Sequence, residues 1–140
     1  MESSVVVCTR NRAPLLEKTL ESLATQTLDH SHFEVLIVDN ASTDSTSDVA
    51  ARWQAARRFT CRYVLEERVG LNHARNRGVR EARGRVIAFI DDDARAEEEW
   101  LDRLLRALEE ERVCGVGGRI KLDWQSPQPR WLTVAPGRHP

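Results

Sequence analysis

Three consecutive aspartates, Asp91, Asp92 and Asp93, are the side chains of this sequence best suited to chemistry. They directly follow an apolar run, residues 86–90, whose composition predicts a buried strand. If the backbone stays extended, Asp91 and Asp93 point to one side and Asp92 to the other. Two carboxylates that face one cleft suit Mg²⁺ or Mn²⁺, which prefer oxygen ligands and often carry a phosphate-bearing molecule. We therefore predict that Asp91 and Asp93 bind a divalent metal, with the larger contribution from Asp93, which lies farther from the strand.

An acidic run before a helix has a simpler alternative role, because negative charge favours the positive end of the helix dipole. In this sequence Glu97, Glu98 and Glu99 already place such charge before the next predicted helix. Three adjacent carboxylates also repel one another unless a cation lies between them. Metal binding is therefore the favoured interpretation of the triplet.

A second acidic position, Asp39, ends the apolar run of residues 33–38 and is followed by Asn40. A carboxylate there can accept hydrogen bonds from a base or a ribose. The alternative is turn formation, because Asn, Ser and Asp all favour turns. We favour a ligand contact for Asp39, and the capping of the following helix for Asp44.

A glycine and several arginines form a third candidate element. Gly70 precedes a predicted helix at residues 72–81, an arrangement that can face a phosphate. Arg75 or Arg68 would then meet a diphosphate as a bidentate donor. A solvated basic helix explains the same residues equally well. The glycines of residues 115–118 follow a predicted strand and precede no helix, so they do not form a dinucleotide-binding fingerprint.

These residues must be positioned by a repeated order of strand and helix. Apolar and β-branched runs predict five strands, at residues 4–8, 33–38, 61–65, 86–90 and 113–116. Amphipathic patterns predict four helices, at residues 13–26, from residue 44 or 45 onward, 72–81 and 97–110. The order predicts an α/β fold with a doubly wound, mainly parallel sheet and helices on both faces. Ligands of such sheets bind beyond the carboxyl ends of the strands, so we expect Asp39 and Asp91 at one edge.

Composition excludes several classes of protein. The chain has 140 residues, enough for one domain, and a formal net charge of −1, so it is not a general polyanion binder. The longest apolar runs are too short for a membrane helix, and the first residues lack the pattern of a signal peptide. A cytoplasmic protein is therefore expected. Its three cysteines are far apart and lie among apolar residues, which favours buried free thiols over a metal or redox site.

Four segments in this order resemble the family 2 glycosyltransferases of the GT-A fold: residues 5–12, 38–44, 70–76 and 89–93. The resemblance covers roughly residues 3–122. It implies a site for a nucleotide-diphospho-sugar donor, most often a uridine diphosphate sugar, and a divalent metal, Mg²⁺ or Mn²⁺. Asp39 matches the family's base-binding aspartate, and Asp91 and Asp93 match the ends of its D-x-D motif. Such enzymes usually invert the anomeric centre.

The resemblance and the strand ends together define the predicted site. The metal ligands are Asp91 and Asp93. The predicted substrate-binding residues are Thr9, Arg10, Arg12, Asp39, Asn40, Gly70, Arg75, Asp91 and Asp92.

The sequence departs from the family after the resembling region. We expect a donor-binding domain at residues 1–125, and at residues 126–140 a tail containing Pro and Trp, or the start of a missing acceptor half. The family's general base lies in that half, and no catalytic residue is assigned here, because residues 109–111 fit a solvated helix face. The chain is thus expected to be an incomplete glycosyltransferase, either a donor-binding fragment of a longer enzyme or a chain that acts with a partner. Association with a membrane through missing regions is the alternative to a free cytoplasmic protein. The alternative is a non-catalytic module that binds nucleotide sugars. A receiver domain or a haloacid-type phosphatase is disfavoured, because both need acidic residues after the first strand.

Overall fold

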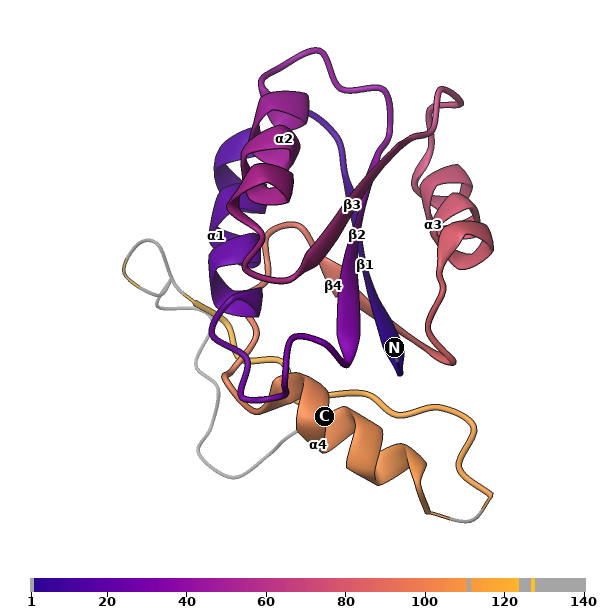
Figure 1. Cartoon of the computed structure of the whole chain (residues 1–140). Coiled ribbons are helices and arrows are strands. Elements are labelled where there is room, and N and C mark those ends of the chain that lie inside the picture. Colours follow the sequence, from indigo (N-terminus) through magenta and orange to yellow (C-terminus); the bar gives the residue numbers. More distant parts are fainter. Residues whose placement is uncertain (1, 111, 124–126, 128–140) are drawn as a thin grey trace.

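A computed structural model describes residues 2–110, 112–123 and 127. Its centre is one parallel sheet of four strands in the order β3-β2-β1-β4 (Figure 1). The strands are β1 (Ser3–Thr9), β2 (Phe33–Asp39), β3 (Thr60–Leu65) and β4 (Val86–Asp91). Each begins or ends within a residue or so of its prediction, because apolar runs long enough to cross the core are easily recognised in the sequence.

The register of the sheet brings the predicted site residues to one edge. Thr9 at the end of β1 lies beside Asp39 of β2, and Cys8 lies beside Asp91 of β4. All neighbouring strands are parallel, so their carboxyl ends share this edge. The prediction that Asp39 and Asp91 meet at one edge is confirmed.

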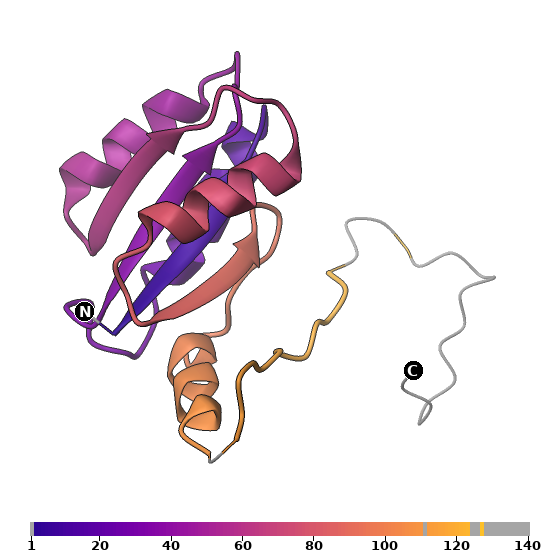
Figure 2. The ribbon, with the colours of Figure 1, turned by 90° about the vertical axis from the view of Figure 1, so that its right-hand side faces the viewer.

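Helices cover both faces of the sheet, as predicted. Helices α1 (Ala13–Leu23) and α2 (Thr46–Ala56) lie on one face and α3 (Leu71–Glu81) on the other (Figures 1 and 2). A fourth helix, α4 (Trp100–Leu108), follows β4. Two helices on one face and one on the other is the arrangement expected when right-handed crossovers join parallel strands in this order.

Alternating side chains of the central strands build two cores. In β1, Val5 and Val7 belong to the core under α1 and α2, whereas Val6 belongs to the core under α3. Gly78 of α3 explains how closely that helix approaches the sheet, because a Cβ atom there would lie 2.5 Å from Val6. Burial on both faces is why the strands read as continuous apolar runs.

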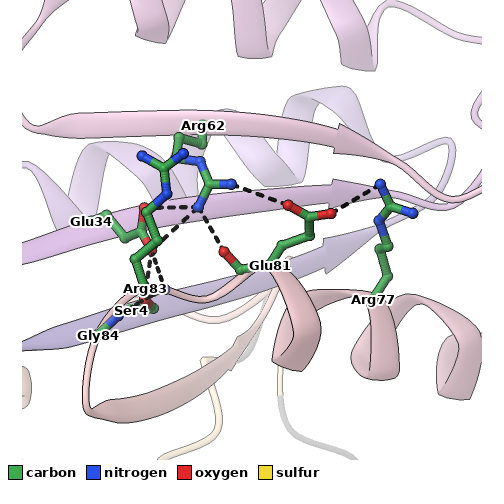
Figure 3. A network of polar contacts seen from close by, with 7 residues as sticks. All are labelled: Ser4, Glu34, Arg62, Arg77, Glu81, Arg83 and Gly84. Atoms are coloured by element: carbon green, nitrogen blue, oxygen red, sulfur yellow. Dashed lines mark hydrogen bonds and ion pairs between the residues drawn. The ribbon is translucent and has the colours of Figure 1, made fainter.

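A polar network anchors the opposite edge of the sheet, where the strands begin (Figure 3). Glu34 of β2 is fully buried and accepts hydrogen bonds from the Ser4 hydroxyl (2.6 Å) and the Arg83 backbone N–H (2.9 Å). Its second oxygen lies 3.2 Å from Nη1 of Arg62, which also donates to the backbone carbonyl of Glu81 at 2.7 Å. The network therefore joins β1, β2, β3 and the end of α3.

Three predicted elements differ from the structure. The first helix ends at Leu23 rather than residue 26, because turn residues follow it. The predicted fifth strand at residues 113–116 is wrong, because the described residues 112–123 contain no strand. A strand needs a neighbour for its backbone hydrogen bonds, and three glycines in this segment weaken any local preference. The fourth helix begins at Trp100 rather than residue 97, because a turn closed by the Trp100 N–H and the Glu97 carbonyl precedes it.

Other expectations have mixed outcomes. Cys8, Cys61 and Cys114 are free thiols, but the prediction that they are buried is not met. Cys8 and Cys61 are half-buried, and Cys114 is exposed because its predicted strand does not form. Among the described residues, none of the helices is long and apolar enough to cross a membrane. The expected tail at residues 126–140 lies, apart from residue 127, outside the described residues.

Candidate functional site

An open cavity of about 470 Å³ lies at the carboxyl edge of the sheet, beside the start of α3. All of the predicted substrate-binding residues except Asp39 line it, and so do both predicted metal ligands, Asp91 and Asp93. The sequence did not single out the remaining lining residues, which are uncharged: Cys8, Val69, Leu71 and Ala74. Nothing in the sequence distinguishes such small or apolar residues from ordinary core positions.

The acidic triplet does not continue the strand. Asp91 is the last residue of β4, and the backbone then turns, closed by a 3.1 Å hydrogen bond from the Ala94 N–H to the Asp91 carbonyl. The expectation of an extended backbone through Asp93 is therefore wrong. The turn nevertheless separates the three side chains, because Asp92 is buried while Asp91 and Asp93 are exposed.

Asp92 is held from two sides. The Thr9 hydroxyl donates to one of its oxygens at 2.7 Å, and Arg12 Nη1 lies 3.2 Å from the other. The Asp92 carboxylate therefore joins the end of β1 to the turn after β4. Its partners make Asp92 an anchor of the site, and the predicted contact between Asp92 and substrate stays a prediction.

Asp91 and Asp93 each face an arginine. Arg75 of α3 lies 3.6 Å from Asp91, whose side chain is 74% exposed, and Arg12 lies 3.3 Å from Asp93, which is 53% exposed. Exposed pairs of this kind contribute little stability, so they exchange partners readily. The carboxylates are then available to a cation, and the guanidinium groups to the oxygens of a phosphate.

These carboxylates fit a metal that takes most of its ligands from elsewhere. Within the described ranges, no three His, Cys, Asp or Glu side chains are grouped so that they could hold a metal ion. Mg²⁺ typically uses one or two carboxylates together with water and phosphate oxygens. Asp91 and Asp93 supply that number of protein ligands.

The loop that enters α3 is shaped by Asn40. Its amide donates to the backbone carbonyls of Glu66 (3.1 Å) and Arg68 (2.8 Å), and its oxygen accepts from the Gly70 N–H (2.7 Å). Gly70 has a φ of 142°, which L side chains rarely adopt. Within the described structure no side chain caps α3, so its first turn faces the cavity edge as a position favourable to an anion.

The two arginines predicted to meet a diphosphate, Arg75 and Arg68, have different surroundings. Arg75 lines the cavity, whereas Arg68 forms two contacts with Glu66, at 2.9 and 3.3 Å. Hydrogen bonds from the Arg68 side chain and backbone lower the pKa of Glu66 to about 2. Arg75 is therefore the better placed of the two for a diphosphate.

Asp39 lies behind the cavity, buried at 2% exposure. One oxygen accepts a hydrogen bond from the Ser42 N–H (2.9 Å) and the other from the Tyr63 hydroxyl (2.8 Å). Asp39 thus makes the turn contact that was the alternative in the sequence, while each oxygen keeps a second acceptor position. The predicted contact with a base stays a prediction.

Asp44 acts at two helix starts. One oxygen accepts from the Thr46 N–H at 3.0 Å and the other from the Ala13 N–H at 3.1 Å. Hydrogen bonds from Thr46 outweigh desolvation and lower the pKa of Asp44. The predicted capping of α2 is met only in part, because Ser45 is the N-cap residue and Asp44, one residue earlier, bonds the first helical N–H. The contact with α1 is an addition that only the fold reveals.

Tyr63 is expected to titrate near pH 12. Burial, and then the hydrogen bond to Asp39, raise the pKa of Tyr63 to about 12. The raised pKa means that the folded state favours the neutral phenol, through burial first and the Asp39 hydrogen bond second. This contribution to stability is complete below about pH 10 and is lost as pH rises toward 12. Tyr63 is the single tyrosine of the sequence, so the absorbance of its phenolate reports it alone. Asp39→Asn should lower the midpoint and Asp44→Asn should not; equal midpoints in all three proteins would contradict the contact.

The fold and the site define an α/β domain with paired acidic and basic side chains at one carboxyl edge of a parallel sheet. The chain belongs to glycosyl transferase family 2, whose model matches residues 4–138. Its structural neighbours are glycosyltransferases with the GT-A fold, which confirms the predicted fold class.

Two curated relatives illustrate the similarity. The chain is 31% identical over 121 residues to glycosyltransferase AglE of Haloferax volcanii, covering 86% of this chain and 40% of AglE. It is 40% identical over 106 residues to a validoxylamine A glucosyltransferase of Streptomyces hygroscopicus, covering 74% of this chain and 25% of that protein. The chain thus spans less than half the length of these relatives.

Two solved structures are also similar. The mannosyltransferase PcManGT of Pyrobaculum calidifontis, in complex with GDP-Man and Mn²⁺, matches with a TM-score of 0.76 and 32% identity, over 80% of this chain and 33% of that one. TarS residues 1–349 of S. aureus, in complex with UDP-GlcNAc, matches with a TM-score of 0.73 and 26% identity, over 86% of this chain and 37% of that one.

Proposed function

We propose that this chain binds the donor of a glycosyltransferase, a nucleotide-diphospho-sugar, together with Mg²⁺ or Mn²⁺, and that the sugar is transferred with inversion. The observation that carries the proposal is the pair of exposed carboxylates in one cavity, Asp91 and Asp93, each beside an arginine. Such a cavity offers oxygen ligands to a metal and guanidinium groups to a diphosphate at the same place. The complexes of PcManGT with GDP-Man and Mn²⁺ and of TarS with UDP-GlcNAc support this ligand class.

The residues of the chain have distinct roles in this proposal. Asp91 and Asp93 would hold the metal, which when bound supplies Lewis-acid stabilisation of charge on the departing diphosphate. Arg75 and Arg12 bind phosphate oxygens, and Arg10 adds positive charge at the same wall. Thr9 and Asp92 fix the acidic turn by their 2.7 Å hydrogen bond. A uridine diphosphate sugar is the preferred donor, and a guanosine diphosphate sugar is the next to test.

A nucleotide-sugar-binding module without catalysis is the second candidate. Among the described residues that line the cavity, the carboxylates are Asp91 and Asp93, assigned here to the metal, and Asp92, which is held by Thr9 and Arg12. None of them is left to act as the general base. A module that only binds the donor needs no such base. Transfer or hydrolysis of the bound sugar by this chain would exclude the second candidate.

A thermal-shift series tests the binding shared by both candidates. The chain is heated with UDP, GDP or their sugars, each with and without Mn²⁺. A ligand at 100 times its dissociation constant should stabilise the fold by about 2.7 kcal/mol, and Mn²⁺ should enlarge the shift. If none of these nucleotides shifts the transition in either condition, donor binding is contradicted.

Asp39 is expected to contribute to binding of the base. Asp39→Asn should weaken nucleotide binding by roughly tenfold, because hydrogen bonds to charged groups contribute about 1.5–3 kcal/mol. Tyr63→Phe is the matched control, since it removes the 2.8 Å hydrogen bond to Asp39 but keeps the carboxylate. Calorimetric titration should show a loss of affinity for Asp39→Asn alone. Equal affinities for both variants would leave Asp39 with its turn contacts only.

A further inference from the structure

Helix α1 and its end carry polar residues on a side that packs against the segment following β4. Thr19, Ser22 and Gln26 are spaced by three and four residues, so they lie on one side of the helical path. Thr19 of α1 and Gln26, three residues beyond the helix, are buried, whereas the other buried residues of α1 are apolar. Buried polar groups need partners, and these three find them in residues 92–101.

Thr19 makes the contacts nearest the proposed metal ligands. Its hydroxyl oxygen lies 2.9 Å from the Asp92 carbonyl and 2.8 Å from the Ala94 carbonyl, and is fully buried. A hydroxyl has one proton, so it donates to one carbonyl at a time. Both carbonyls belong to the turn that carries the acidic triplet. Thr19 therefore holds the backbone of this turn, as Thr9 holds the Asp92 side chain.

Ser22 and Gln26 extend the attachment. The Ser22 hydroxyl oxygen accepts from the Ala96 N–H at 3.0 Å. The Gln26 amide donates to the Glu97 carbonyl at 2.8 Å and accepts from the Leu101 N–H at 3.0 Å. The path from the acidic turn to α4 is thus fixed along α1.

We infer that Thr19 is a positioning residue, which sets the backbone of the acidic turn so that Asp91 and Asp93 present their carboxylates to one metal. The inference rests on the proposed function. In the part of the chain that the structure describes, the side chains of Asp91 and Asp93 contact exposed arginines alone, so their placement depends on the backbone that carries them. Mg²⁺ demands a nearly ideal arrangement of ligands, so a displaced turn weakens metal binding before it affects the rest of the cavity.

The test compares Thr19→Val, which keeps the β-branched shape without the hydroxyl, with Thr19→Ser, which keeps the hydroxyl. Two affinities are measured by calorimetry: UDP or GDP without metal, and Mn²⁺ for the nucleotide complex. Thr19→Val should weaken Mn²⁺ binding by about tenfold, the usual effect of removing a residue that holds metal ligands in place. Nucleotide binding without metal should be unchanged. Thr19→Ser should restore Mn²⁺ binding. Thr25→Val is the matched control, because the exposed Thr25 hydroxyl donates to the nearby Ser22 carbonyl and not to the acidic turn.

Each outcome decides the inference. Unchanged Mn²⁺ affinity in Thr19→Val overturns it, and so does an equal loss of both affinities, which a merely structural role would give. If Thr19→Val fails to fold, Thr19→Ala is measured against the same two criteria. Amide exchange at Ala94 gives a readout without ligand and should accelerate in Thr19→Val. If the wild type binds no nucleotide and exchange is still faster in Thr19→Val, Thr19 anchors the turn but the proposed function is wrong. The metal-positioning role is then wrong as well.

Discussion

Replacing Asp91 or Asp93 with asparagine is expected to remove the Mn²⁺-dependent part of nucleotide binding. Each variant loses one charged oxygen ligand from a site that offers the metal only two exposed carboxylates. Removing a residue that merely supports a metal ligand typically lowers metal affinity by about 10–100-fold. Removing a ligand itself should therefore lower Mn²⁺ affinity by at least about tenfold. Nucleotide affinity without metal should change less, because Arg12 and Arg75 remain. Titration of Mn²⁺ into the nucleotide complex measures the effect.

Asp92→Asn and Asp102→Asn complete the series. Asp92 is buried between Thr9 and Arg12, so its substitution should lower the free energy of unfolding by about 1–3 kcal/mol with a smaller effect on metal dependence. Asp102 pairs with Arg106 on α4, remote from the cavity, and serves as the control. If Asp92→Asn is the most damaging to metal dependence, the proposed ligands are wrong. If none of the variants changes the Mn²⁺ dependence of nucleotide binding, the three aspartates only form a turn whose charge the arginines balance.

The sheet could be predicted because its strands cross the core. Residues 35–38 and 86–90 are apolar on both faces, a pattern that few other elements produce. The parallel direction of strands joined by helices then places Asp39 and Asp91 at one edge, and the register confirms it. The fifth strand could not be predicted reliably, since whether residues 113–116 form a strand depends on a partner and not only on their composition.

The sequence indicates which residues lie at the site more readily than it indicates which of them are buried. Asp39 and Asp91 both end apolar strands and look alike in the sequence. In the structure Asp39 is buried against Tyr63, whereas Asp91 is exposed beside Arg75. These partners come from other elements, so no local pattern reveals them. The contact of Thr19 with the acidic turn was missed for the same reason, because it joins residues 73 positions apart.

Glu34→Ala is expected to lower the free energy of unfolding by about 3–5 kcal/mol, the usual cost of removing one partner of a buried ion pair. Glu34 is fully buried and satisfies the Ser4 hydroxyl, the Arg83 N–H and the Arg62 guanidinium. Its removal leaves the Ser4 hydroxyl at the amino edge of the sheet without this acceptor and breaks the buried pair with Arg62, which keeps its contacts with Glu81 (Figure 3). Nucleotide binding by the folded variant should be unchanged, because the cavity lies at the opposite edge. Urea unfolding at pH 7 gives the free energy.

The pH dependence of the same contact separates charge from packing. Burial tends to raise the pKa of Glu34, but hydrogen bonds from Ser4, Arg83 and Arg62 outweigh it, so the pKa falls below its ordinary value of 4.5. A lowered pKa in the folded state means that the stabilisation is complete above about pH 4.5 and is lost as the pH falls through the lower folded value. The difference in stability between wild type and Glu34→Gln should therefore be larger at pH 7 than at acidic pH below 4.5.

Glu99→Gln provides the control for both measurements. Glu99 pairs with Arg103 on the exposed side of α4, and exposed pairs contribute at most about 1 kcal/mol. Its substitution should leave the unfolding free energy and its pH dependence nearly unchanged. A Glu34→Ala variant no less stable than Glu99→Gln would contradict the assignment of the network as an anchor. A Glu34→Gln difference that stays constant from pH 7 into the acidic range would instead show that shape and hydrogen bonding, rather than the negative charge, hold the amino edge of the sheet together.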